Sequence, residues 1–269
     1  MTRKRVLYGV IAVLISSFLI SSVIYINSLL PIITGYAAKN LGSAVFVSQR
    51  DQNDVEKTDL NFSFIRFANN KVNSEDKSVT SNFLWGRSKA IYREGFGVTL
   101  IRDKEEEILR HDKYPADIRP GYMQDTISWP LGDIIPDSAT GIDKVALNKI
   151  AKRLINDDGY KGNAFAFMVV HKGIPVAEAY KPQFNKNTRF LSWSMAKSFT
   201  NALVGILVKE GKVDINKPVD IEEWKKDERR TITLNNLMQM QSGLKWNENY
   251  GNRSDVTVML HCKSDMSDL

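Results

Sequence analysis

The chain has 269 residues, of which 43% are hydrophobic and 25% charged, enough for one membrane segment and one globular domain. Its net charge is +6, but basic residues alternate with acidic ones and no basic stripe is interleaved with aromatic residues, so we expect no nucleic-acid partner. Cys262 is the only cysteine and the three histidines are scattered, which excludes an internal disulfide and argues against a zinc site; we expect neither metal nor cofactor.

The first 38 residues predict a membrane anchor. Arg3, Lys4 and Arg5 precede an uncharged run over residues 6–38, which is longer than the roughly 20 apolar residues that cross a bilayer. Because basic residues stay on the cytoplasmic side, we expect a single-pass inner-membrane protein whose remaining chain is periplasmic or extracellular. The alternative is a cleaved signal segment, for which residues 35–37 offer a small-x-small cleavage site.

Residues 39–140 form an N-terminal extension with weak patterns. We expect short strands at residues 45–47 and 95–101, and a polar loop at residues 69–82. Four prolines predict a loop-rich connection to the next region: Pro115, Pro120, Pro130 and Pro136. These residues indicate no role for the extension beyond packing on the following domain or spacing it from the membrane.

Residues 141–269 carry a clearer pattern. Apolar residues at helical spacing predict an amphipathic helix over residues 142–158, which Gly159 ends. The β-rich runs at residues 163–171 and 175–180 flank Lys172-Gly173, which predicts a hairpin. The last segment, from residue 255, begins like another helix.

Ser194-Met195-Ala196-Lys197 follows this hairpin and opens an apolar run that Gly211 ends. Residues three apart share one helix face, so the Lys197 amine can reach the Ser194 hydroxyl. A serine nucleophile needs such a base, and a buried lysine can lose its proton. The apolar run predicts a helix buried inside a domain. The alternative is a helix-capping serine, with Lys197 extending into solvent.

Two further Ser-x-x-Lys sequences lack this context. Ser74 to Lys77 lies in a polar stretch where no lysine would be desolvated. Ser242 to Lys245 contains Ser-Gly, which favours a turn. We therefore expect only Ser194 and Lys197 to be catalytic.

The sequence over residues 192–198, Ser-Trp-Ser-Met-Ala-Lys-Ser, resembles the nucleophile motif of the β-lactamase-related serine hydrolases. These include class C β-lactamases, penicillin-binding carboxypeptidases and aminohexanoate-dimer hydrolases. Residues 240–248, with Ser-Gly-Leu-Lys-Trp, are similar to the aminohexanoate-hydrolase-like branch. The resemblance implies an α+β, β-lactamase/transpeptidase-like fold over residues 141–269, with an antiparallel sheet flanked by helices.

The resemblance also implies the chemistry. Ser194 would form an acyl-enzyme with Lys197 as base, and the backbone N–H of Ser194 would be one oxyanion donor. The substrate would be a small-molecule or peptide-like amide or ester, with a β-lactam-type bond less favoured. The substrate itself and the oligomeric state are not indicated by the sequence.

The chain departs from the family pattern after this point. Tyr250-Gly251-Asn252 fits the family's Tyr-x-Asn motif, but it lies too early in the chain, so we expect a surface turn there. A Lys-Thr-Gly-like closing strand does not follow before Leu269. We therefore expect an incomplete, C-terminally truncated domain that is inactive alone. The alternative function is a catalytically inactive, wall- or partner-binding protein that retains the family scaffold.

Overall fold

The computed structural model describes residues 3–111, 124–136, 141–156, 159–160 and 162–267. The chain forms two compact units. The first comprises Met1–Arg189 together with Thr257–Leu269, and the second is Phe190–Val256. The helix and the hairpin predicted after residue 141 belong to the first unit.

The first unit begins with a single long helix, α1 (Arg3–Gly42), which continues without a break past residue 38. Residues 7–25 are largely apolar and exposed, whereas the helix from Leu30 onward is largely buried or half-buried against the rest of the unit. The exposed half is long and apolar enough to span a membrane. A π-helical turn, Ser43–Val47, follows α1 directly. The strand expected at residues 45–47 is therefore wrong, because the helical backbone extends through it.

The long helix lies on a four-stranded antiparallel sheet with the order β1-β2-β3-β4. The strands are β1 (Asn69–Asn73), β2 (Ser78–Phe83), β3 (Gly86–Arg93) and β4 (Gly97–Leu100). The loop expected at residues 69–82 is thus wrong. Although its side chains are polar, its backbone forms a hairpin in which Asn69 pairs with Asn82. The strand expected near residues 95–101 is confirmed by β4. Of the four prolines, Pro115 and Pro120 lie outside the described residues.

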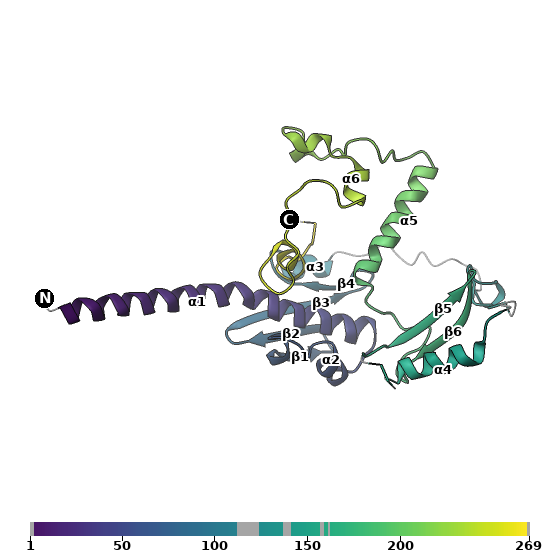
Figure 1. Cartoon of the computed structure of the whole chain (residues 1–269), viewed down its shortest axis with the longest axis horizontal. Coiled ribbons are helices and arrows are strands. Elements are labelled where there is room, and N and C mark those ends of the chain that lie inside the picture. Colours follow the sequence, from purple (N-terminus) through teal and green to yellow (C-terminus); the bar gives the residue numbers. More distant parts are fainter. Residues whose placement is uncertain (1–2, 112–123, 137–140, 157–158, 161, 268–269) are drawn as a thin grey trace. The chain divides into compact units, whose positions relative to one another are not determined.

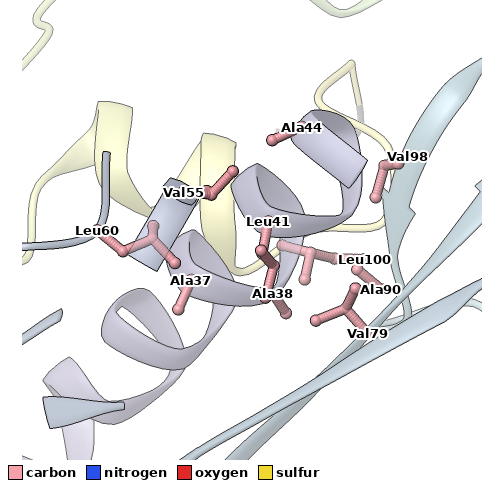
Figure 2. Close-up of a cluster of buried hydrophobic side chains, with 10 residues drawn as sticks. All are labelled: Ala37, Ala38, Leu41, Ala44, Val55, Leu60, Val79, Ala90, Val98 and Leu100. Atoms are coloured by element: carbon pink, nitrogen blue, oxygen red, sulfur yellow. The ribbon is translucent and has the colours of Figure 1, made fainter. Parts of the chain in front are cut away.

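The core of this unit lies between α1 and the sheet (Figure 2). Ala37, Ala38 and Leu41 project from α1, and Ala44 projects from the π-helical turn after it. The small alanines let the helix backbone lie close to the strands. Their partners come from the sheet and from the segment after α1: Val55, Leu60, Val79, Ala90, Val98 and Leu100. Burial of these side chains holds the C-terminal half of α1 on the sheet.

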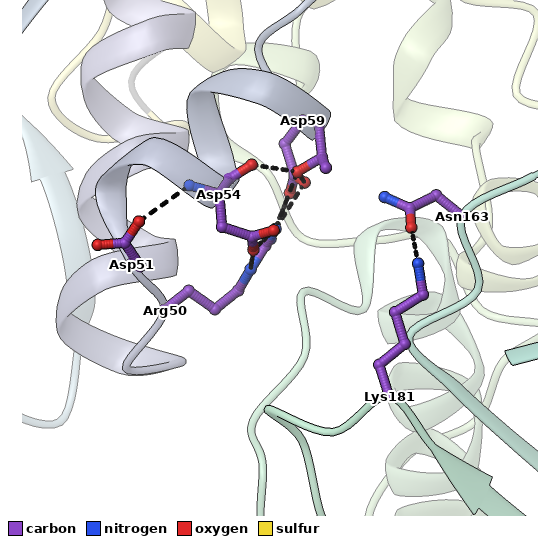
Figure 3. Close-up of polar contacts among 7 residues, drawn as sticks. Arg50, Asp51, Asp54, Asp59, Asn163 and Lys181 are labelled. Atoms are coloured by element: carbon purple, nitrogen blue, oxygen red, sulfur yellow. Dashed lines mark hydrogen bonds and ion pairs between the residues drawn. The ribbon is translucent and has the colours of Figure 1, made fainter. Parts of the chain in front are cut away.

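A second helix, α2 (Gln52–Thr58), begins at Asp51, whose carboxylate accepts a hydrogen bond from the Asp54 N–H. The nearly buried Arg50 forms ion pairs with Asp54 at 2.8 Å and Asp59 at 2.6 Å (Figure 3). Its guanidinium carbon also lies 4.5 Å from the centroid of the Phe165 ring. Arg50 therefore joins the N-terminal layer of this unit to the hairpin region.

The hairpin region consists of α4 (Lys144–Ile155), β5 (Ala166–His171) and β6 (Ile174–Tyr180). The two strands pair antiparallel, and α4 packs mainly on β6. Ala151 and Ile155 of the helix and Val176 and Ala177 of the strand are buried. The helix and hairpin expected here are confirmed, although residues 157–158 of the expected helix lie outside the described part.

The C-terminal segment returns to the first unit. Helix α7 (Asp255–His261) confirms the helix expected from residue 255. Arg102, which follows β4, donates hydrogen bonds to the His261 carbonyl at 3.0 Å and the Pro31 carbonyl at 2.7 Å. Its own N–H donates to Ser264 Oγ at 2.9 Å. The short helix α3 (Glu106–His111) lies next along the chain from Arg102.

The second unit is built of helices and turns. It contains α5 (Ala196–Lys209), α6 (Leu234–Met238) and the 3-10 turns Trp193–Met195, Glu222–Trp224 and Glu228–Thr231. Gly211 after α5 has φ +69°, which fits the helix end expected there. Helices and antiparallel sheets in one chain confirm the α+β class at this coarse level.

Candidate active site

Ser194 and Lys197 lie at the start of α5. Ser194 is the middle residue of the 3-10 turn Trp193–Met195, and Lys197 lies in the first turn of the helix. The Lys197 Nζ donates a hydrogen bond of 3.1 Å to Ser194 Oγ. This contact follows from the spacing of three residues, which stacks the two side chains on one face. The geometry is that of a hydroxyl nucleophile beside an amine.

The backbone before Ser194 is unusual. Trp193 has φ +46°, in the left-handed region that non-glycine residues seldom adopt. The Met195 N–H donates back to the Ser192 carbonyl at 3.0 Å, which closes a tight turn. Strained residues of this kind cluster at functional sites, where the surrounding structure holds them. The turn presents the Ser194 hydroxyl at the very beginning of the helix.

The pair is exposed, and so is the helix that carries it. Phe199, Leu203 and Ile206 all expose more than half of their side-chain surface. The buried helix expected from the sequence is therefore wrong for the described structure. Within residues 190–256 the other elements are short turns and one five-residue helix, which offer no layer broad enough to cover α5. Lys197 is thus not desolvated by its own unit.

The two other Ser-x-x-Lys sequences form turns, as expected. Ser74 and Lys77 are exposed in the connection between β1 and β2. Ser242 Oγ accepts a hydrogen bond of 3.3 Å from the Leu244 N–H, and Gly243 has φ +75°. Among the described residues, a serine–lysine hydrogen bond at this spacing occurs at Ser194 and not at these two positions.

Tyr250 lies in a surface turn, as expected. Its side chain is well exposed, and the neighbouring Gly251 N–H donates to the Asn249 side-chain oxygen at 2.9 Å. In the part of the chain that the structure describes, no group of three or more acidic, histidine or cysteine side chains is placed to hold a metal ion.

The sequence patterns do not predict the buried polar cluster of Tyr36, Lys39, Arg102 and His261. His261 is only 4% exposed and lies in ring contact with Tyr36 of α1. Burial, followed by the charges of Lys39 and Arg102, lowers the pKa of His261 from 6.5 to about 3. The available signal was Gly35, where a side chain would collide with the His261 carbonyl. A lone glycine in an apolar run does not reveal its partner 226 residues later in the chain.

Comparison with known families gives one match. Residues 149–257, less than half of the chain, match the family model described as Beta-lactamase. Neither the curated proteins nor the solved structures give a match. The matched segment contains the hairpin, α5, Ser194 and Lys197. It supports a β-lactamase-related serine hydrolase family for this region, and the aminohexanoate-hydrolase-like branch stays a prediction.

Proposed function

We propose that the chain is a membrane-anchored serine hydrolase that cleaves an amide, ester or β-lactam-type bond through an acyl-enzyme on Ser194. The observation that carries the proposal is the 3.1 Å hydrogen bond between Lys197 Nζ and Ser194 Oγ inside a Beta-lactamase-family segment. A hydroxyl is a weak nucleophile at neutral pH, and an amine at this distance is within reach of its proton.

The chemical step is ordinary acyl transfer. Ser194 Oγ bonds to the substrate carbonyl carbon while its proton passes to the neutral amine of Lys197. The resulting ammonium gives that proton to the departing amine or alkoxide as the carbonyl–leaving-group bond breaks. Water then attacks the acyl-enzyme ester and loses a proton to Lys197. Lys197 returns this proton to Ser194 Oγ as the bond between the acyl carbon and Oγ breaks and the acid product leaves. The Ser194 N–H at the helix start is a candidate donor to the oxyanion.

Lys197 acts as a base only when its amine is neutral. In the structure Lys197 is exposed, and its Nζ already lies 3.1 Å from Ser194 Oγ. A substrate lying over the pair would exclude water from both side chains, and exclusion of water favours the neutral amine. Lys197 therefore becomes a base when the substrate is bound.

The anchor part of the proposal rests on α1. Residues 35–37, where a signal segment could be cut, lie inside the helix, and Ala37 is fully buried in the core. Cleavage there would remove core residues, so the uncleaved anchor is favoured over a removed signal. Arg3, Lys4 and Arg5 before the span orient the remainder toward the periplasm or cell exterior. The substrate is then a small or peptide-like amide or ester on that side.

Active-site labelling tests the proposal. Membranes that carry the protein as the cell makes it, with any residues encoded beyond Leu269, are exposed to a fluorophosphonate and to a labelled penicillin. We expect a label that Ser194→Ala abolishes and that Ser74→Ala and Ser242→Ala retain. Label that persists in Ser194→Ala would assign the nucleophile elsewhere. No label in the wild-type chain would favour the catalytically inactive, wall- or partner-binding protein.

The base is tested by removing its amine while the stem is kept. Lys197→Met should slow acylation by about 10²–10⁴-fold, the usual contribution of a general base. Lys209→Met, in the last turn of the same helix, is the matched control and should label at the wild-type rate. An unchanged rate in Lys197→Met would contradict the base role and leave the Ser194 assignment standing.

A further inference from the structure

An exposed apolar cluster lies at one end of the four-stranded sheet. Leu84 and Trp85 form the two-residue turn between β2 and β3, because Phe83 pairs with Gly86. Phe64 and Phe67 precede β1, whose first residue, Asn69, pairs with Asn82 at the same end. The Phe64 and Phe83 rings are 6.3 Å apart. Leu84, Trp85, Phe64 and Phe67 are each 58–63% exposed. These four residues are called the apolar collar below.

The collar lies where α1 leaves the sheet. A side chain at Gly86, next to the turn, would approach Leu30 of α1 to within 2.7 Å. Trp85 donates its indole N–H to the Asn27 side-chain oxygen at 3.2 Å, one turn further toward the N-terminus. At the other end of the sheet, Gly42 lies against Val98. The helix therefore runs along the strands, and its N-terminal part projects beyond the sheet (Figure 1).

The exposed half of α1 has the length of a bilayer core. Residues 7–26 carry no charge, and at about 1.5 Å per residue they span about 30 Å, the hydrocarbon thickness. The membrane boundary then falls at Asn27, the residue that Trp85 contacts. Tryptophan and other amphipathic aromatic side chains are favoured at this depth. Arg66 and Arg87, which are close to the collar residues in the sequence, are also exposed. Basic side chains beside such a surface favour anionic lipid headgroups.

We propose that Phe64, Phe67, Leu84 and Trp85 form a lipid-binding surface that enters the headgroup region of the bilayer crossed by α1. The inference rests on the membrane insertion of α1 that is part of the proposed function. The collar is a second contact with the membrane besides α1. Two contacts fix the orientation of the sheet relative to the membrane, which a single helix would not do. Contact with lipid would cover these four exposed apolar side chains, which lie beside the part of α1 that enters the membrane.

Environment-sensitive labels test the surface in the full chain. In a Cys262→Ser background, single cysteines replace Phe67 or Leu84 and carry a nitrobenzoxadiazole label, in vesicles of phosphatidylcholine with phosphatidylglycerol. Phe96→Cys is the matched control. Like Phe67, Phe96 is an exposed phenylalanine beneath an arginine, but it lies in the turn at the opposite end of β3. Phe18→Cys reports insertion of α1.

We expect labels at Phe67 and Leu84 to shift to the blue and to be quenched by a lipid with a doxyl group near the headgroup. The label at Phe96 should stay solvent-like, and the label at Phe18 should be quenched by a doxyl group near the end of the acyl chain. Solvent-like labels at both Phe67 and Leu84, with Phe18 quenched, would overturn the lipid-binding surface and leave the anchor standing. A solvent-like label at Phe18 would overturn both.

Discussion

The imidazole of His261 is enclosed at the junction between α1 and the C-terminal segment. It lies against the Tyr36 ring, and its Nδ1 has no hydrogen-bond partner among the described residues. The facing charges, Lys39 and Arg102, are both positive, so a proton on this ring would be buried and repelled. The folded chain therefore holds His261 neutral, with its pKa lowered to about 3.

This lowered pKa predicts that the first unit loses stability in mild acid. The unfolded chain takes up a proton near pH 6.5 and the folded chain does not, so stability is complete above that pH and falls as the pH falls. Unfolding of the detergent-solubilised chain should require about 2 kcal/mol less at about pH 5 than at about pH 7. His261→Gln should remove most of this difference in denaturant titrations.

The control for this prediction is His171→Gln, because His171 lies partly exposed at the end of β5. A comparison of the two variants separates the effect of the buried imidazole from the effect of losing a histidine of the same unit. Hydrogen bonds from the Ser264 and Ser267 N–H groups lower the pKa of Asp103 and Asp265 to about 2, so their stabilisation is lost only below about pH 4. The same pH dependence in His261→Gln as in the wild type would assign it to other groups.

At the scale of elements, helix α1 has an exposed part and a buried part. Residues 7–25 of α1 are largely exposed, whereas the part after Leu30 packs against a sheet and the C-terminal segment. Gly35 allows the closest approach. A Cβ there would lie 2.6 Å from the His261 carbonyl oxygen and 2.6 Å from Arg102 Nη2.

Gly35→Ala should therefore destabilise the first unit by about 1–3 kcal/mol, because the backbone of residue 261 must move away. Gly9→Ala is the control in the same helix, since nothing lies within 4 Å of a Cβ at that position. Alanine favours a helix over glycine by about 1 kcal/mol, so Gly9→Ala should not lower the unfolding midpoint. Thermal unfolding followed by circular dichroism distinguishes the two. Equal midpoints would show that the junction adapts to a methyl group.

Helix α5 shows how far an element's own sequence reaches. The apolar run after Ser194 correctly predicts a helix, which ends at Lys209 before Gly211. The same run wrongly predicts burial, because exposure depends on what covers a helix and the pattern carries only its own side chains. The contact between Ser194 and Lys197 was predictable because it is local, being set by the helical repeat alone.

At the scale of the whole molecule, Arg50 joins parts of the first unit that are distant in sequence. It binds Asp54 and Asp59 on one side and lies over the rings of Phe165 and Phe184 on the other. The N-terminal layer of this unit and the hairpin of the Beta-lactamase-matching segment are thereby held together. A charged side chain that is 6% exposed, with two carboxylates and two rings around it, depends on all these partners.

Arg50→Met should lower the unfolding free energy by about 1–3 kcal/mol, because two carboxylates lose their hydrogen-bond donor. Amide exchange in β5 and β6 should accelerate at the same time. Lys225→Met is the control, since it removes exposed ion pairs with Asp220 and Glu222 that contribute little. Amide exchange in β5 and β6 of Arg50→Met at the wild-type rate would show that Arg50 stabilises only α2.

The sequence by itself determined the features that depend on neighbouring residues. These are the apolar helix before Asn27, the hairpin of β5 and β6, and the proximity of Ser194 to Lys197, each of which follows from a short periodicity or turn. The hairpin of β1 and β2 was missed because its strands are polar and only their pairing marks them. The tertiary structure alone decided which surfaces are covered. In this structure the second half of α1 and the distant His261 are buried, α5 is exposed, and Trp85 contacts Asn27 where α1 leaves the sheet. The sequence could not show this, because burial results from contacts between segments that are far apart in the chain.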